Sequence, residues 1–143
     1  MKIVDLNILL YAINRDAAQH SAARHWWERA LSDDEPIGLT WVVLSGFLRI
    51  STNPKVFPHP LTPDQAMAKV EAWFSHANTR VVLETEGHWR ILKRLLKTTG
   101  TAGNLTTDAH LASLAISYGA ALVSCDSDFS RFPELRWENP LGG

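Results

Sequence analysis

Five short apolar or β-branched segments alternate with longer helical patterns along this chain, and that alternation limits its possible folds more than any other feature does. The strand-like segments are residues 3–4, 37–39, 80–83, 121–124 and 135–138. Parallel strands need crossover connections, which are usually helices, so strands separated by helices predict an α/β fold with a mostly parallel sheet. A chain of 143 residues suits one domain, which we expect to cover residues 1–143.

The helical patterns have recognisable start and stop signals. Helices are expected over about residues 7–14, 17–31, 40–50, 62–76, 86–98 and 106–118. Thr40 is expected to cap one helix, and Thr106 or Thr107 another. Gly119 is placed to end the last of them, because glycine readily adopts the left-handed backbone that follows a helix.

Composition excludes several protein classes. Cys125 is the single cysteine, so no disulfide can form within the chain, which fits a reducing compartment. No signal peptide is expected before the first strand-like segment, and no apolar run approaches the roughly 20 residues of a membrane span. We therefore expect a cytoplasmic protein that does not enter the membrane. The net charge of −1 is low for a nucleic-acid binder, so contact with RNA would need a local basic patch or metal ions.

Acidic side chains occur where strands of the predicted sheet end. Asp5 directly follows the first strand, while Asp126 and Asp128 follow the strand over residues 121–124. Asp108 falls in the first turn of a later helix. Ligands of parallel α/β sheets lie outside the carboxyl ends of the strands, so these four carboxylates are candidates for one site.

Four carboxylates in one place repel one another and raise each other's pKa, and a hard divalent cation removes that penalty. Such a cation also activates water for hydrolysis of phosphodiesters. Each acid has another interpretation: Asp108 can complement a helix N-terminus, and Asp126 and Asp128 can be turn formers. A carboxylate at Asp5, between Val4 and Leu6, is costly without a partner.

Three polar residues flank the acids. Asn7 can cap the first helix, or hold a metal-bound water or a phosphate. Thr107 and Ser124 can cap backbone groups or hydrogen-bond to the carboxylates as supporting partners. For Thr107, capping is the favoured interpretation.

Four segments together resemble the PIN-domain ribonucleases, specifically the VapC-type toxins of VapBC toxin–antitoxin pairs. The segments are residues 4–7 (VDLN), 47–50 (FLRI), 103–112 (GNLTTDAHLA) and 126–129 (DSDF). Their order and spacing cover nearly the whole chain, and the segment around Asp108 is the most specific of them.

The resemblance implies a three-layer α/β/α sandwich and a Mg²⁺ or Mn²⁺ site. It implies endonucleolytic cleavage of RNA, often transfer or ribosomal RNA. It also implies a homodimer that is inhibited by a cognate VapB-type antitoxin, a segment of which enters the active-site groove. Carried over by position, Asp5 and Asp108 look like the principal metal ligands, Asp126 like the third acid and Asp128 like a nearby, more variable one.

One position departs from the family pattern. The family commonly has a glutamate just before Phe47-Leu48-Arg49, whereas this chain has Gly46, which is expected to bring its backbone close to a neighbour, with substrate as one candidate. The departure opens an alternative, a catalytically weakened PIN-fold protein that acts by binding RNA or antitoxin. A phosphoryl-transfer domain with Asp5 as nucleophile is a further rival, but Ser124-Cys125-Asp126 supplies no lysine where such domains need one.

Basic and aromatic residues give weaker signals. Arg49 can reach a phosphate near the metal or pair with one of the aspartates. A basic row at helical spacing follows Glu86: Arg90, Lys93, Arg94 and Lys97. It is either a solvated helix face or a strip that contacts phosphates. The helical tryptophans, at positions 26, 27, 41, 73 and 89, are expected in the core or a dimer interface. The histidines show no metal-ligand spacing, and His110 should face away from Asp108 on their helix.

Overall fold

Strand β1 (Lys2–Val4) lies at the centre of a five-stranded sheet with the order β3-β2-β1-β4-β5, in the computed structural model of residues 1–142. The other strands are β2 (Ile37–Leu39), β3 (Thr79–Val81), β4 (Ala121–Val123) and β5 (Arg136–Glu138). Every neighbouring pair is parallel, which confirms the expected α/β class. Residue 143 of the predicted single domain lies outside the described residues.

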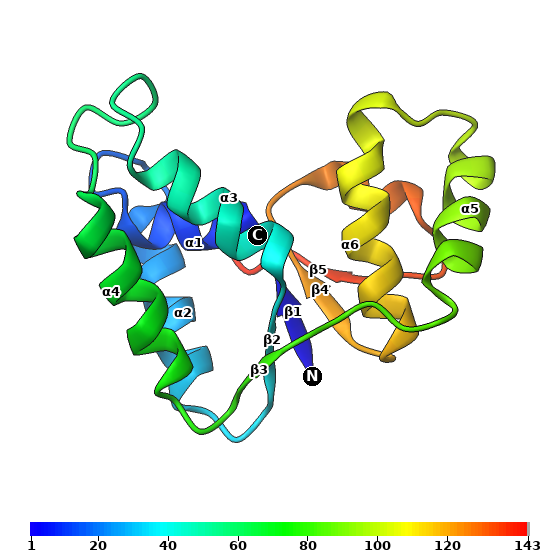
Figure 1. Ribbon diagram of the computed structural model, residues 1–143, viewed down its shortest axis with the longest axis horizontal. Coiled ribbons are helices and arrows are strands. Elements are labelled where there is room, and N and C mark those ends of the chain that lie inside the picture. Colours follow the sequence, from blue (N-terminus) through cyan, green and yellow to red (C-terminus); the bar gives the residue numbers. More distant parts are fainter. Residues whose placement is uncertain (143) are drawn as a thin grey trace.

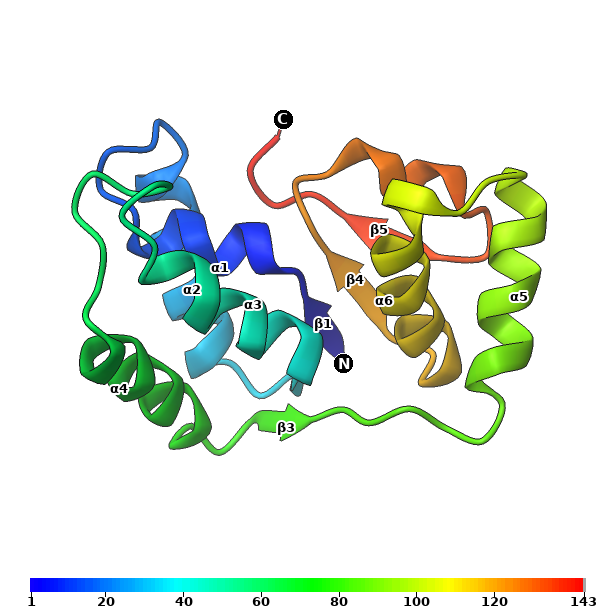
Figure 2. The same cartoon turned by 45° about the horizontal axis from the view of Figure 1, so that its top comes forward.

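Six α-helices cover the two faces of the sheet. They are α1 (Leu6–Ile13), α2 (His20–Ser32), α3 (Trp41–Ser51), α4 (Pro63–Phe74), α5 (His88–Thr99) and α6 (Thr106–Ser117). Helices α1 to α4 lie on one side and α5 with α6 on the other, which gives the predicted three layers (Figures 1 and 2). The chain leaves β1 on one side to reach β2 and returns on the other to reach β4, so the sheet has a switch point between β1 and β4.

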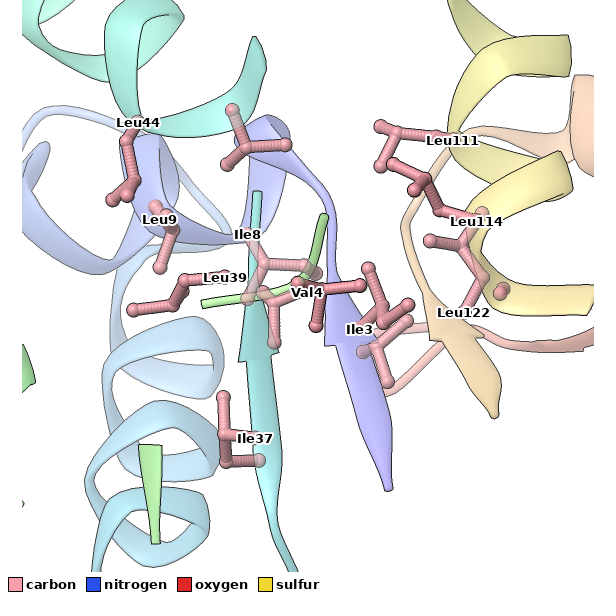
Figure 3. Packing of buried hydrophobic residues seen from close by; sticks show 14 of the residues in the cluster. Ile3, Val4, Ile8, Leu9, Ile37, Leu39, Leu44, Leu111, Leu114 and Leu122 are labelled. Carbon is pink, nitrogen blue, oxygen red and sulfur yellow. The ribbon is translucent and has the colours of Figure 1, made fainter. Parts of the chain in front are cut away.

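The core fills both faces of the central strands. Ile3 pairs in register with Leu122, and both lie toward Leu114 of α6 (Figure 3). Val4, the next residue, faces the opposite side with Ile8 of α1, as the alternation of side chains along a strand requires. All five side chains are fully buried. Burial on both faces explains why these strands are continuous apolar runs.

Several predicted helix ends are confirmed. Thr40 precedes α3, and its hydroxyl accepts a hydrogen bond from the backbone N–H of Val43 (3.4 Å). Gly119 has φ +60°, the left-handed backbone that ends α6. Thr62 and Gln65 form a reciprocal capping box at the start of α4.

Two predicted helix starts are wrong. Neither Thr106 nor Thr107 caps α6, because a 3₁₀ turn (Gly103–Leu105) runs directly into the helix and places Leu105 at the cap position. Helix α2 begins at His20 rather than Ala17. Successive turns occupy the preceding residues, and the backbone N–H of His20 donates to the Ala17 carbonyl (3.1 Å).

The tryptophans divide between core and surface. Trp27 and Trp73 are buried and meet edge to face, with ring centroids 5.6 Å apart. Trp41 is 57% exposed and Trp89 66%, so the core does not account for these two. Within residues 1–142, each helix is too short or too polar to cross a lipid bilayer.

Candidate metal centre

The carboxyl ends of β1 and β4 meet at the switch point of the sheet. Asp5 follows β1, and its backbone N–H donates to the Val123 carbonyl of β4 (2.9 Å). Beyond this bond the two chains diverge, one into α1 and the other into the loop that carries Ser124 and Asp126. The parallel pairing therefore brings together acids that are far apart in sequence.

Three carboxylates converge at this edge. Asp108, Asp126 and Asp128 each place a carboxylate oxygen within 4.8 Å of the other two. Asp108 projects from the first turn of α6, whereas Asp126 caps the 3₁₀ helix η2 (Ser127–Arg131) that follows β4, and Asp128 lies within it. The Asp126 carboxylate also accepts the backbone N–H of Asp128 (2.9 Å), so Asp126 forms the turn and belongs to the cluster. The turn interpretation of Asp126 is therefore confirmed, and its carboxylate also lies close to two others.

Ser124 connects Asp5 to this cluster. The Ser124 side chain is fully buried, and its hydroxyl donates to Asp5 Oδ2 (2.7 Å). The Ser124 hydroxyl oxygen itself accepts hydrogen bonds from the backbone N–H of Asp126 (3.0 Å) and from the side-chain amide of Asn7 (3.1 Å). One buried hydroxyl thus fixes the relative positions of residues from both strands, which matches the expected supporting role of Ser124.

Asp5, and not Asn7, caps the first helix. Asp5 Oδ1 accepts the backbone N–H of Leu6 (2.7 Å) at the start of α1. Asn7 lies inside α1, where its amide oxygen accepts the backbone N–H of Cys125 (3.2 Å). The capping interpretation of Asn7 is therefore wrong, because the residue two positions earlier already satisfies the helix end.

The acids carry uncompensated charge. Burial raises the pKa of Asp108 to about 6, with further contributions from the carboxylates of Asp126, Asp5 and Asp128. Burial also raises the pKa of Asp5, and it raises that of the Cys125 thiol to about 11 with help from Asp5 and Asp126. Among residues 1–142, the ion pairs include none of these four aspartates. A set of oxygen donors with excess negative charge suits a hard divalent cation.

Two residues predicted near the substrate are exposed, and within residues 1–142 their side chains form no hydrogen bond or ion pair with the acids. Arg49 is exposed in the last turn of α3, and none of the described ion pairs includes it, so its pairing with an aspartate is not found. Thr107 is exposed in the first turn of α6, beside Asp108 in sequence. Neither side chain hydrogen-bonds to the cluster within residues 1–142.

A contact between two histidines was not predicted from the sequence. His88 Nε2 and His110 Nδ1 are 2.9 Å apart, and His110 Nε2 lies 3.4 Å from Glu84 Oε1. Burial and the neighbouring His110 lower the pKa of His88. The pair joins the start of α5 to α6, and it confirms that His110 faces away from the acids. No spacing rule could reveal it, because its members belong to different helices.

Removing the Ser124 hydroxyl should weaken metal binding at the acid cluster. Ser124→Ala is expected to weaken binding of a divalent metal by about 10- to 100-fold, since it removes the group that orients Asp5. Ser113→Ala is the matched control, because Ser113 is equally buried but its hydroxyl bonds only to the Ala109 carbonyl within α6. Isothermal titration with Mn²⁺ measures both variants, and equal affinities would contradict the role of Ser124.

Gly46 makes its close approach to Leu6, not to open space. A Cβ atom at Gly46 would lie 2.8 Å from Leu6 Cδ2, the end of a side chain that follows Asp5 directly. The absent side chain therefore lets α3 pack against the start of α1. The predicted close approach at Gly46 is therefore confirmed, and the neighbour is Leu6.

Alanine at position 46 should stabilise the protein more when Leu6 is shortened as well. In an unobstructed helix, Gly→Ala contributes about 1 kcal/mol. Here that gain should appear in a Leu6→Ala background, and should be clearly smaller beside the native Leu6. Urea denaturation of the four proteins in this cycle measures the coupling. Equal gains in both backgrounds would show that Leu6 does not restrict position 46.

Comparisons with known proteins identify the family of this chain. The family model described as PIN domain matches residues 2–135. Ribonuclease VapC37 of Mycobacterium tuberculosis is 43% identical over 140 residues, which cover 98% of this chain and 97% of that protein. Ribonuclease VapC33 of the same organism is 42% identical over 141 residues and 99% of each chain.

Solved structures share the fold at lower identity. VapBC2 from Rickettsia felis, bound to a DNA fragment from its promoter, aligns with a TM-score of 0.70 and 22% identity over 96% of this chain and 97% of that one. VapC20 of Mycobacterium tuberculosis, described as a sarcin-ricin loop cleaving toxin, aligns with a TM-score of 0.66 and 20% identity over 95% and 99%.

Proposed function

The chain belongs to the PIN-domain family, among the VapC-type ribonuclease toxins, and we propose that Asp5, Asp108, Asp126 and Asp128 hold the divalent metal of its active site. The observation that carries this assignment is the convergence of three carboxylates within 4.8 Å beside the Asp5–Ser124 hydrogen bond. Asp5, Asp108 and Asp126 are the principal ligands in this proposal. Asp128, which is exposed, adjusts the site from its margin.

The ion is Mg²⁺ or Mn²⁺ in this proposal, because all the donors are oxygens. Such an ion, when bound, lowers the pKa of water and offsets charge on the phosphodiester. Ser124 and Asn7 hold the Asp5 carboxylate in place through their hydrogen bonds. Arg49 and Thr107, both exposed, are assigned to binding the substrate phosphates.

The substrate class is RNA, and structured RNA such as transfer or ribosomal RNA is the proposed target. The test is cleavage of a total small-RNA pool by the purified protein with Mg²⁺ or Mn²⁺, beside Asp5→Asn and an EDTA control. Cleavage that disappears in both controls supports the metal assignment. Cleavage that persists in EDTA contradicts it.

The same experiment decides whether Gly46 weakens the enzyme. We expect the native protein to cleave, because the acid cluster forms without a side chain at position 46. If the native protein left the pool intact and Gly46→Glu cleaved it, the alternative of a catalytically weakened binding protein would hold instead.

A cognate VapB-type antitoxin is the proposed protein partner. Several solved structures with the same fold are toxin–antitoxin complexes, including VapBC from Salmonella typhimurium. Expression of the toxin with and without the antitoxin gene tests this, with growth as the readout. RNA and antitoxin partners together place the protein in the cytoplasm under this proposal.

A homodimer is proposed from the surface around edge strand β3. Val81 (41% exposed) and Leu83 (53%) lie on and just after this strand. Trp41, at the start of α3, stacks edge to face on Phe74, with ring centroids 6.5 Å apart. An unpaired sheet edge next to exposed apolar side chains is typical of a surface that a partner covers.

A charge on this surface should convert the dimer to a monomer. Leu83→Asp would place a carboxylate in an apolar interface without a partner, which is strongly unfavourable. Val56→Asp is the matched control, because Val56 is equally exposed (54%) but lies in the loop between α3 and α4. Light scattering during gel filtration gives the mass, and a Leu83→Asp dimer would refute this interface.

A further inference from the structure

Helix α5 carries a row of cations along its outer face. Arg90, Lys93, Arg94 and Lys97 are all exposed, as the helical spacing predicts. Together with Thr98 they line a surface hollow of about 370 Å³. No acidic side chain lines this hollow, so its lining is cationic in a chain whose net charge is −1.

One of the four cations already forms an ion pair within the folded chain. Arg94 makes two hydrogen bonds to the Glu134 carboxylate, both of 2.9 Å, and so ties α5 to the segment before β5. Arg90, Lys93 and Lys97 take part in no ion pair within residues 1–142. We call these three residues the α5 row. Their charges remain available to an anionic partner.

The α5 row leads toward the acid cluster. Helices α5 and α6 run antiparallel and pack side by side, so the end of α5 lies beside the start of α6 (Figures 1 and 2). Lys97 belongs to the last turn of α5, and Asp108 to the first turn of α6. The row therefore begins at the end of the helix pair that carries Asp108 and extends away from it.

An exposed aromatic ring flanks the row. Trp89 is 66% exposed, although tryptophan is usually largely covered in a folded chain. Successive helical residues are about 100° apart, which puts Trp89 about 40° around the helix from Lys93. Cations beside an exposed aromatic ring are the usual components of a surface for single-stranded nucleic acid, which presents regularly spaced phosphates and unpaired bases.

We propose that Arg90, Lys93 and Lys97 bind the sugar-phosphate backbone of single-stranded RNA as it leaves the acid cluster, and that Trp89 stacks on a base. The inference rests on the proposed function, because it takes RNA as the substrate. The row spans about 10 Å along the helix axis, a length that meets more than one phosphate of a nucleic-acid strand.

The test is binding of a short fluorescein-labelled oligouridylate, measured by anisotropy over a series of salt concentrations. All proteins carry Asp108→Asn, so that the probe is not cut. The row variant combines Arg90→Gln, Lys93→Gln and Lys97→Gln. The control combines Arg29→Gln, Lys55→Gln and Lys69→Gln, which are also exposed cations, lie outside α5 and form no ion pair within residues 1–142.

The row variant should bind the probe at least about 10-fold more weakly at low salt. Its slope of log affinity against log salt should be shallower by about 2, since each lost phosphate contact removes about 0.7. Trp89→Ala should lose about 10-fold in affinity with the slope unchanged, and Trp89→Phe should recover most of that affinity.

Equal losses of affinity in the row and control variants would overturn the proposal. Tighter binding of polyglutamate than of RNA to the row would also overturn it, in favour of an acidic protein partner.

Cleavage kinetics separate this inference from the proposed function. With the native acids, the row variant should raise KM for RNA and leave kcat nearly unchanged, because α5 holds none of the four aspartates. An unchanged KM would overturn the inference while the ribonuclease assignment stands. If the native protein cut no RNA, the proposed function would fail, and the binding comparison would still decide whether the α5 row binds RNA.

Discussion

Asp108→Asn should lower metal-dependent RNA cleavage by more than about 100-fold and, with metal removed, should make the protein more stable. Replacing groups that only support a metal ligand costs up to about 100-fold in metal affinity or activity, so loss of a ligand itself should exceed that figure. The gain in stability has a separate cause. Burial and three neighbouring carboxylates hold the pKa of Asp108 at about 6, above its ordinary value of 3.8.

The pH dependence of this effect has a definite sign. A carboxyl whose pKa is raised by folding favours the folded state only while it is protonated, so the metal-free protein loses stability as pH rises from about 4 to about 6. Asparagine carries no charge and avoids that loss. Its advantage over aspartate should therefore be complete at neutral pH and should shrink as pH falls from 6 toward 4. Water and salt partly screen this half-exposed site, so the sign of the difference is what tests the prediction.

Thermal unfolding in EDTA and in Mg²⁺ measures both parts of the prediction. The native protein should gain stability from Mg²⁺, whereas Asp108→Asn should gain much less. Asp34→Asn, at an exposed aspartate outside the cluster, is the control and should behave like the native protein. A lower unfolding temperature for Asp108→Asn in EDTA at neutral pH would show that the acids do not repel one another in the folded chain.

Phe47→Ala should reduce the free energy of unfolding by about 3–5 kcal/mol. Phe47 is fully buried in α3, and its ring meets Trp73 of α4 edge to face with centroids 4.7 Å apart. Trp73 in turn packs on Trp27 of α2, so one truncation leaves a cavity where three helices meet. Rigid aromatic neighbours cannot close such a cavity by small rotations, which puts the effect in the upper range for core substitutions.

Urea denaturation followed by tryptophan fluorescence measures this loss. Phe47→Leu, which keeps most of the volume, should cost much less. Trp89→Ala is the matched aromatic control, since its exposed ring should contribute about 0.5 kcal/mol or less. A loss below about 1 kcal/mol for Phe47→Ala would mean that the helices repack around the missing ring.

The strands and the acid positions were predictable because local and tertiary signals coincide. An apolar run that ends at a carboxylate, as at Val4 and Asp5, marks both a buried strand and its functional end. Parallel pairing then places Asp5 and Asp126 at one edge, whatever the intervening helices contain. For the same reason Thr40 was identified correctly, since its capping bond depends only on residues three positions away.

The remaining features depend on neighbours that a sequence does not reveal. Thr107 is a good cap by residue type, but a preceding 3₁₀ turn takes over the helix start. Asp5 and Asn7 both suit a cap, and only the structure shows that Asp5 accepts the Leu6 N–H while Asn7 lies inside α1. Gly46 in α3 lies against Leu6 in α1, so the two residues belong to different helices. The glycine in the sequence could therefore predict a close approach but could not identify the neighbour.

The central position of β1 has a consequence for synthesis of the protein on the ribosome. Asp5 emerges early, but its partner Ser124 follows 119 residues later, and Asp126 and Asp128 come later still. Until β4 has been translated, β1 lacks one of its two neighbouring strands and the acids cannot assemble. Under the proposed metal assignment, a nascent chain is therefore unable to cut RNA until β4 and the segment that carries Asp126 and Asp128 have been translated.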